Sequence, residues 1–599
     1  MSGTGAQSGV AGVLLAYAAV VSYPTWSLTD VLNGRPRIRV NQLGYLVGRT
    51  MQATVVTDSP TPVEFVVRDG ADRAMRTGTS QPSLVQPDPT SAQTVQLLDF
   101  TGLSGEQEGC RVEAAGLQSH RFRVSTRLYG DLARDALRFF YLMRSGTPVD
   151  DGLAPGYGRP AGHVGRPPNR GDVAVPAWTG PEAERLYPGW QDDGRYDVSG
   201  GWYDAGDYGK YVTSGAISVW QLLNTLDLLA RRPESATTAA RAVSIAQECR
   251  WQLDWLLSMQ VPPGRPLAGL AFHRVHGTVW SPLPGWPHLD PADRVLHRPS
   301  TGAALHLAAA TAHGARLLRA GDRPYADRLL LAARTAYDAA RRHPQLAAPD
   351  DHARFGGGPY GDDRLDDDFY WAATELWLAT GDDRYRRDVL DSPQHTREAF
   401  DPAGFDYDSV TAPARLDLAL AGGFDGHEQV VAGVRDGADR LVELQRRQPW
   451  GQPYAPLDGW DWGSNGRILN NLVVLGVAHL VTGDDRYHDA VAVGMDYLLG
   501  RNGLGQSYVT GYGVDFSRHQ RTRQFGHDLD PAMPPPPSGA LAGGANSRPA
   551  ADFPYDSRLV GLPPQLCYLD EPTSEVTNDV CIRWNAPLVW VATYLDTAP

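Results

Sequence analysis

The chain has 599 residues, of which 42% are hydrophobic and 21% are charged, and its formal net charge is -14. This length exceeds what one hydrophobic core usually organises, so we expect two or more domains, or one large domain with an accessory module. The composition is that of a folded protein rather than a disordered one. Nucleic-acid binding requires concentrated positive charge, so the acidic balance excludes a nucleic-acid partner and favours a neutral ligand.

Residues 1–35 are expected to be a leader or an unstructured N-terminus. The apolar run from Val10 to Ser22 is too short to span a bilayer, and it has the length of a signal-peptide core. No Lys or Arg precedes Arg35, so the positively charged region that usually begins a signal peptide is missing. In spite of this departure, the apolar run favours export, and we expect a secreted protein with no membrane partner.

The cysteines predict no metal site, because they form neither a CxxC pair nor a cluster with histidine. The chain has four of them: Cys110, Cys249, Cys567 and Cys581. A disulfide bridge between the last two stays open at this point.

Residues 36–126 predict a β-sandwich. From Ile38 to about Ser125 the chain consists of short runs in which apolar and polar side chains alternate, among them RIRVNQLGY, VEFVVRDG and HRFRVS. Turn-forming Gly, Pro, Asp and Ser residues separate these runs. Such short alternating strands are typical of an antiparallel sandwich of about 90 residues.

Residues 127–599 predict a helical domain, because apolar residues recur there at three- and four-residue spacing, as in ISVWQLLNTLDLLARR. A Gly-Asp pair followed by Tyr recurs at Gly321, Gly381 and Gly483. In each linker, we expect the Gly to close one helix in the left-handed conformation and the Asp to cap the next helix. About twelve helices joined as six hairpins around an axis predict an α/α barrel, or toroid.

Two carboxylates, Asp204 and Asp207, lie three residues apart in the segment DVSGGWYDAGDYGKYV, just before a predicted helix. Hydrolysis of a glycosidic bond with inversion needs a carboxylate that activates water on one face of the sugar. It also needs an acid on the other face, about 6.5–9.5 Å away. The pair suits the base side of this reaction, although a helix cap, a turn or a set of metal ligands is the commoner use of such a loop.

This segment is similar over its whole length to the catalytic-base segment of family 9 glycoside hydrolases, and the chain resembles that family from Ile38 to Leu595. VNQLGY is similar to the start of the immunoglobulin-like domain that precedes many of these catalytic domains. RFFYLMRSG, WGSN and DYLLGRNGLGQSYVTGYG are similar to family segments in the expected order. The resemblance implies an all-β immunoglobulin-like sandwich followed by an all-α six-hairpin barrel. It also implies that Asp207 is the base and that Asp204 helps to hold the water.

The resemblance places four further residues in the substrate cleft. In the family, an H-x-R element after the GQSYVTGYG segment hydrogen-bonds sugar hydroxyls, which implies His519 and Arg521. Asp570 and Trp584 are implied to position the sugar at the cleavage site. For the arginine, pairing with an acid as a purely structural group is the alternative.

The general acid is where the sequence departs from the family, whose members carry a Glu shortly before an aromatic-Asn-Ala segment. Counting back from that segment places Asp579 at the position of the acid, and Glu575 stands where an aromatic residue is usual. Asp is one methylene shorter than Glu, a loss of roughly 1.3 to 1.5 Å of reach. A misplacement of about 1 Å costs roughly a hundredfold in rate. We expect Asp579 to be the acid, with Glu575 as the alternative.

Acidic residues also cluster just before a predicted helix, and they include Asp363, Asp367 and Asp368. Oxygen ligands of this kind suit Ca²⁺, and the family often binds calcium near an acidic pair at this place. The alternative is that the charge favours the N-terminus of the helix. No cofactor is expected for the chemistry itself.

The sequence therefore predicts a monomeric glycoside hydrolase that cleaves β-1,4-glucan with inversion, as an endo-acting cellulase. Two alternatives stay open. One is an exo-acting β-glucosidase or glucosaminidase of the same fold. The other is a glycan-binding protein whose turnover is impaired because Asp579 replaces the glutamate.

Overall fold

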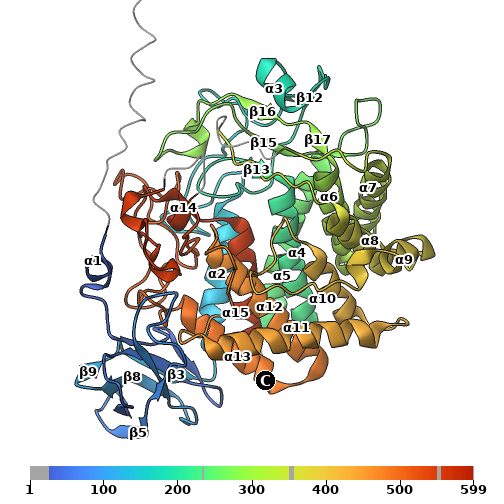
Figure 1. Ribbon diagram of the computed structural model, residues 1–599. Coiled ribbons are helices and arrows are strands. Elements are labelled where there is room, and N and C mark those ends of the chain that lie inside the picture. The colour runs from blue at the N-terminus through green and yellow to red at the C-terminus, as the bar shows by residue number, and fades with distance from the viewer. Residues whose placement is uncertain (1–25, 233–234, 350–355, 550–554, 598–599) are drawn as a thin grey trace, which may run out of the picture.

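The computed structural model describes residues 26–232, 235–349, 356–549 and 555–597, and it consists of a small β domain and a larger helical domain (Figure 1). The apolar run expected to form the core of a leader lies outside the described residues. A short helix, α1 (Leu28–Leu32), precedes the first strand. None of the helices in the described part of the chain combines the length and the apolar character that a membrane crossing requires.

The N-terminal domain is a sandwich of two sheets, as predicted. The first sheet has the order β1 (Ile38–Arg39), β3 (Gln52–Val56), β7 (Val95–Asp99) and β6 (Gln81–Pro82). The second has the order β2 (Gly44–Leu46), β10 (Phe122–Ser125), β8 (Gln107–Ala114), β4 (Glu64–Arg68) and β5 (Ala74–Thr79), with β9 (Leu117–Gln118) on β8. Neighbouring strands are antiparallel except β2 and β10, which are parallel. Apolar side chains from both sheets, among them Val55, Phe65 and Val112, form the core between them.

Among the described residues, six helices form the inner ring of the second domain. They are α4 (Val212–Ala230), α6 (Thr301–Leu318), α8 (Asp366–Thr380), α10 (Thr411–Ala421), α12 (Ser464–Thr482) and α15 (Ile582–Thr597). Each helix contacts the next, and α15 contacts α4, so that the ring is closed. Helix α6 is buried along nearly its whole length, because its surface of small and apolar residues faces other elements on every side.

Six outer helices in the described part of the chain complete the hairpins. They are α2 (Gly130–Leu142) on α15, α5 (Ala236–Ser258) on α4, α7 (Arg323–Arg342) on α6, α9 (Asp383–Leu390) on α8, α11 (His427–Arg447) on α10 and α13 (Asp485–Leu498) on α12. Helix α7 buries one face, with Tyr325, Leu329 and Ala336, while its other face carries arginines. The two-layered ring confirms the predicted α/α barrel.

The loops of the barrel carry short elements. They are α3 (Pro181–Leu186), α14 (Glu575–Asn578), β11 (Val175–Pro176), β12 (Arg195–Tyr196), β13 (Lys210–Tyr211), β14 (Ala271–Phe272), β15 (Arg274–Gly277), β16 (Arg294–Leu296) and β17 (Pro299–Ser300). Single 3-10 turns occur at Pro287–Leu289, Pro393–His395, Ser557–Leu559 and Pro564–Leu566.

The three Gly-Asp linkers join inner to outer helices, as predicted. In each linker the Asp side chain caps the following helix by accepting a backbone N–H: Asp322 for α7, Asp382 for α9 and Asp484 for α13. Gly381 and Gly483 adopt the left-handed conformation, with φ of 69° and 71°. The prediction is wrong at Gly321, which lacks a positive φ because α6 ends earlier, with Arg319 as its cap, and a turn follows.

All four cysteines are buried and free. The bridge between Cys567 and Cys581 is therefore absent. The Cys567 thiol faces backbone carbonyls, with the Leu562 oxygen 3.4 Å from its sulfur, whereas the Cys581 sulfur lies 3.6 Å from an oxygen of Asp204.

A buried hydrogen bond joins the two domains. Asn41, in the turn between β1 and β2, donates from Nδ2 to Oδ1 of Asp496 on α13 at 2.8 Å, and both side chains are buried. Burial raises the pKa of Asp496 to about 7, whereas the Arg501 guanidinium and the Asn41 amide act in the opposite direction. The β domain thus supplies a donor that the buried carboxyl of the barrel requires.

We expect the substitution Asn41→Ala to lower the free energy of unfolding by about 2–3 kcal/mol, because it leaves the Asp496 carboxyl buried without this donor. Denaturant unfolding followed by intrinsic fluorescence measures the change. The matched control is Gln52→Ala, which removes an exposed hydrogen bond to Asp99 in the same domain. That change should stay within about 0.5 kcal/mol. Equal losses for the two variants would contradict the assignment.

Candidate active site

A cavity of about 360 Å³ opens at the N-terminal ends of the inner helices. Its walls come mainly from the loops that lead into α4, α8, α10, α12 and α15. Placing functional side chains on loops above a rigid ring is a common arrangement in enzymes. The lining is rich in aromatic and charged side chains: Asp207, Tyr211, Trp280, Tyr360, Asp406, Tyr407, Asp408, Asp461, Trp462, Arg467, Arg521, Arg523, Glu575, Asp579, Arg583 and Trp584.

Three segments that are far apart in the sequence lie side by side at the cavity: residues 204–209, 519–523 and 578–582. Isolated β-bridges pair Ala205 with Cys581 and Arg521 with Asp579. Backbone hydrogen bonds from Ile582 to the Asp204 carbonyl and from Arg523 to the Gly206 carbonyl, at 2.8 and 2.9 Å, strengthen this arrangement. The loop that carries Asp204 and Asp207 is therefore fixed by main-chain contacts to both other segments.

Gly206 allows this close approach. Its amide donates to Oδ1 of Asp579 at 3.0 Å, and the amide of Val580 donates to the same oxygen at 2.9 Å. A Cβ atom on Gly206 would lie 2.6 Å from that oxygen and would also collide with the Arg521 carbonyl. Only glycine fits here, and the loop of Asp207 directly sets the position of the Asp579 carboxyl.

Asp579 lies in the cavity wall with only 8% of its surface exposed. Burial raises the pKa of its carboxyl well above the ordinary value, and the nearby charges of Glu575 and Asp207 act in the same direction. These surroundings favour the protonated form, which is the form that a general acid needs before it reacts.

Glu575, the first residue of α14, also lines the cavity. Its Oε2 lies 3.0 Å from Nη2 of Arg521, and both side chains are largely buried. This contact engages the Glu575 carboxylate with Arg521. The geometry therefore suits Glu575 to holding Arg521 better than to donating a proton.

Asp204 lies behind the cavity wall and is fully buried. Its Oδ1 accepts a hydrogen bond from Ser214, and its Oδ2 accepts one from the Tyr360 hydroxyl. Burial raises the pKa of Asp204 to about 6, while the Arg583 guanidinium and both hydroxyl donors act against this rise. Asp207, in contrast, is part of the wall, and its Oδ2 accepts from the Gly209 amide at 2.9 Å.

Comparison with known proteins agrees with this arrangement. Residues 129–592 match glycosyl hydrolase family 9, and residues 33–119 match the cellulase N-terminal ig-like domain. The chain belongs to glycosyl hydrolase family 9.

Two curated relatives are similar over most of this family 9 chain. Endoglucanase C of Cellulomonas fimi is 44% identical, and the alignment covers 94% of this chain and 52% of that protein. A cellulose 1,4-beta-cellobiosidase of Acetivibrio thermocellus is 36% identical, with 94% and 67% covered. The chain thus spans about half the length of the first relative and two thirds of the second.

Two solved structures share the fold of this family 9 chain. A Bacteroides ovatus GH9 structure superposes with a TM-score of 0.78 at 27% identity, covering 94% of this chain and 99% of that one. A structure solved in complex with cellobiose-like isofagomine also has a TM-score of 0.78 at 27% identity, covering 94% and 100%.

Of the four residues expected to contact sugar, the structure brings Arg521 and Trp584 to the cavity, but it does not place His519 or Asp570 in the lining. Asp570 instead accepts the backbone N–H groups of Arg518 and His519, at 2.8 and 3.0 Å. The His519 imidazole pairs with Asp528 at 2.8 Å. The sugar contacts of His519 and Asp570 therefore stay predictions: only Nδ1 of His519 is engaged, and Asp570 holds the backbone of the segment that leads to Arg521.

Sequence reasoning missed several residues of the family 9 cavity, above all Tyr360, Tyr407 and Arg583. The ring of Tyr360 lies 5.2 Å from that of Tyr407, and the Arg583 guanidinium lies over both rings. Nη1 of Arg583 donates to Asp406 at 2.9 Å. These residues lack a periodic pattern. The one sequence feature that could have indicated them is their position, because each lies just before or at the start of an inner helix, as Asp207 does.

The acidic residues at the start of α8 have unequal surroundings. Asp368 is buried and contacts His306 at 2.7 Å, and Asp367 is nearly buried, whereas Asp363 is exposed. Neither oxygen of Asp368 has a hydrogen-bond partner among the described residues, and burial raises the pKa of the neighbouring Asp362 to about 7. Buried carboxylates of this kind fit a hard cation such as Ca²⁺, and Asp362 suits that role better than Asp363.

Proposed function

We propose that this chain hydrolyses β-1,4-glucosidic bonds of cellulose or related β-glucans with inversion, as an endo-acting enzyme. One observation carries the proposal: the hydrogen bond between Gly206 and Asp579 holds the loop of Asp207 and the Asp579 carboxyl at one cavity. The names of the relatives support the substrate class, since one is an endoglucanase and another is a cellobiosidase.

Aromatic side chains of the cavity support binding of a neutral sugar chain. Trp280, Tyr360, Tyr407, Trp462 and Trp584 all contribute to its lining. Aromatic rings pack against the apolar faces of glucose units, while the carboxylates and guanidinium groups between them hydrogen-bond hydroxyls. We propose that the enzyme acts outside the cell as a monomer, on a polymer that cannot cross a membrane. The carboxylates at the start of α8, Asp367 and Asp368 above all, are proposed to hold a structural Ca²⁺.

In the proposed reaction, Asp207 takes a proton from a water molecule while the water oxygen attacks the anomeric carbon. The bond from that carbon to the glycosidic oxygen breaks, and Asp579 gives its proton to the leaving oxygen. Asp204 acts from behind the wall, where its charge supports the position of the water and of Asp207. After product release, exchange with solvent returns a proton to Asp579 and removes one from Asp207.

Asp579 is proposed as the acid in preference to Glu575. Its burial supports a retained proton, and its hydrogen bonds to two backbone amides support a fixed direction. The same two hydrogen bonds hold the short side chain close to the Asp207 loop. We therefore propose that turnover is limited by the reach of Asp579. A glycan-binding protein with little turnover is the second candidate function, favoured by the same feature.

Hydrolysis of a soluble β-glucan tests the proposed function. Asp207→Asn should lower kcat about a hundredfold to ten-thousandfold, because it removes the base. The exposed Asp197 lies in the same sequence segment, so Asp197→Asn is the matched control and should retain wild-type activity. NMR of fresh product should show the α-anomer first. Near wild-type turnover in Asp207→Asn, or the β-anomer as first product, would contradict the proposed mechanism.

The choice of acid is tested by two substitutions. We expect Asp579→Glu to raise kcat about tenfold to a hundredfold, because it restores roughly 1 Å or more of reach. Glu575→Gln should leave kcat within severalfold of wild type and act mainly on KM through Arg521. Steady-state kinetics on the same glucan separates these effects. If Asp579→Glu lowers the rate, or if Glu575→Gln alone abolishes it, the assignment is wrong.

The pH dependence of kcat/KM tests the role of Asp204, whose pKa lies at about 6. Because the ionised form is the active one, we expect kcat/KM to fall as the pH drops through this value. Tyr360→Phe removes a donor that favours the ionised form, so it should raise this pKa and move the acid limb to higher pH. Tyr407→Phe, next to Tyr360, is the control and should leave the limb in place. An unchanged limb in Tyr360→Phe would remove Asp204 from the mechanism.

A further inference from the structure

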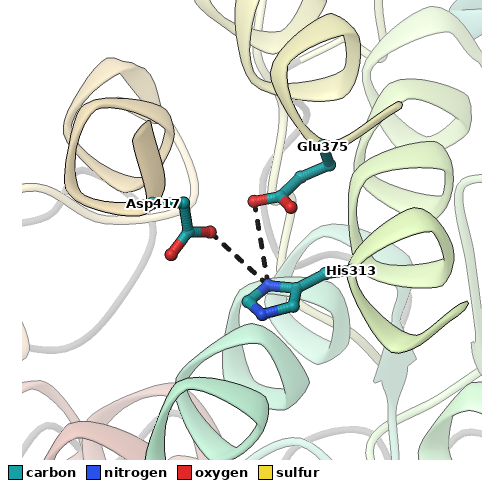
Figure 2. Close-up of side chains that lie close together, drawn as sticks. All are labelled: His313, Glu375 and Asp417. Atoms are coloured by element: carbon teal, nitrogen blue, oxygen red, sulfur yellow. Dashed lines mark ion pairs between the residues drawn. The ribbon is translucent and has the colours of Figure 1, made fainter. Parts of the chain in front are cut away.

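Three ionisable side chains meet inside the inner ring, apart from the cavity lining. They are His313 on α6, Glu375 on α8 and Asp417 on α10, and all three are buried (Figure 2). One potential ligand atom from each lies within 4.8 Å of the others. Figure 2 shows the two carboxylates facing the same side of the imidazole, from which dashed lines run to both.

The protein itself leaves most of these polar atoms without hydrogen bonds. Among the described residues, neither ring nitrogen of His313 and neither carboxylate oxygen of Glu375 has a hydrogen-bond partner. Oδ2 of Asp417 accepts from the Trp220 indole at 2.7 Å, and the Arg316 guanidinium lies 3.5 Å from Glu375. Unpaired polar groups are expensive inside a core, so a cluster of this kind calls for a bound partner, either a metal ion or a proton shared between the two carboxylates.

From this arrangement we infer that His313, Glu375 and Asp417 bind one divalent transition-metal ion, with Zn²⁺ as the ion that the donors fit best. Nδ1 of His313 lies 3.5 Å from Oδ2 of Asp417 and 3.7 Å from Oε1 of Glu375. Ligands about 2.0–2.2 Å from a tetrahedral zinc stand about 3.3–3.6 Å from one another. Small side-chain movements therefore suffice for binding.

The donor set separates this site from a calcium site. One imidazole nitrogen and two carboxylates suit zinc and similar ions, whereas Ca²⁺ requires six to eight oxygen ligands. The two carboxylates offset the charge of a divalent ion, and Arg316 beside Glu375 adds one positive charge to the cluster. The rival arrangement is a single proton shared between Glu375 and Asp417, which would partly neutralise the cluster without any metal.

A metal ion here would join three neighbouring inner helices, and Trp220 would connect α4 to the same site through Asp417. Such an ion acts on stability, because it binds the folded chain and has no preformed site in the unfolded chain. None of the three ligands lines the cavity. Metal removal should therefore lower Tm, and hydrolysis should not require the ion directly.

The metal content of the full-length protein tests the inference. After gel filtration in metal-free buffer, mass spectrometry of the elements should find one zinc or similar transition-metal ion per chain. Treatment with 1,10-phenanthroline should lower Tm, and Zn²⁺ should restore it while Ca²⁺ does not. In chelator-treated wild type, Co²⁺ should produce visible absorption bands that saturate at one equivalent. No bound metal after reloading, together with a Tm that Zn²⁺ does not change, would overturn the inference in favour of the shared proton.

Isosteric variants locate the metal. Glu375→Gln and Asp417→Asn should each lose the ion and become insensitive to the chelator. The matched control is Asp290→Asn, which alters another fully buried histidine–carboxylate pair, with His163 3.1 Å away. His163 also hydrogen-bonds to Tyr203, so this pair has the protein partners that His313 lacks. The control should keep its metal. Retention of one zinc by both ligand variants would place the ion elsewhere and overturn the assignment.

Discussion

Closure of the inner ring is the constraint on which the active site depends. Helix α15 contacts α4, although hundreds of residues separate them in the chain. The segment that precedes α4 meets the start of α15, where the Ile582 amide donates to the Asp204 carbonyl. If α15 did not pack against α4, Asp207 and Asp579 would both be present in the chain but would not lie at one cavity. The proposed catalytic residues and the closed ring thus share one contact.

The electrostatics of the site follow from the same packing. Asp204 and Asp579 are both buried by the meeting of the segments, and burial is the largest cause that raises the pKa of each. Their partners differ, however. Around Asp204, the Arg583 guanidinium and two hydroxyl donors favour charge more than Asp207 opposes it, whereas around Asp579 the charges of Glu575 and Asp207 outweigh Arg521 and the Val580 amide. One folding event therefore separates two chemically identical side chains into a group that favours charge and a group that favours its proton.

Much of this arrangement could be predicted from the sequence, because it leaves periodic or contiguous signals. Alternation identified the sandwich, three- and four-residue spacing identified the ring, and one continuous segment identified Asp207. The positions of His519 and Asp570 could not be predicted in this way. A carboxylate can face the cavity or hold a loop. The choice depends on backbone donors such as the Arg518 amide, and the residue pattern does not show where these donors lie. The contact between Tyr360 and Arg583 could not be predicted for a related reason, since it arises only when separate loops meet.

The hydrogen bond between Gly206 and Asp579 has an evolutionary consequence. Both donors to the Asp579 oxygen are main-chain amides, which no amino-acid substitution removes unless it introduces proline. Gly206 itself cannot gain a side chain without a collision. Neighbouring side chains therefore have little means to redirect the carboxyl, and the accessible change in its reach is the length of residue 579 itself. With Asp579 as the proposed acid, catalytic speed would change in discrete steps with the length of the side chain at position 579.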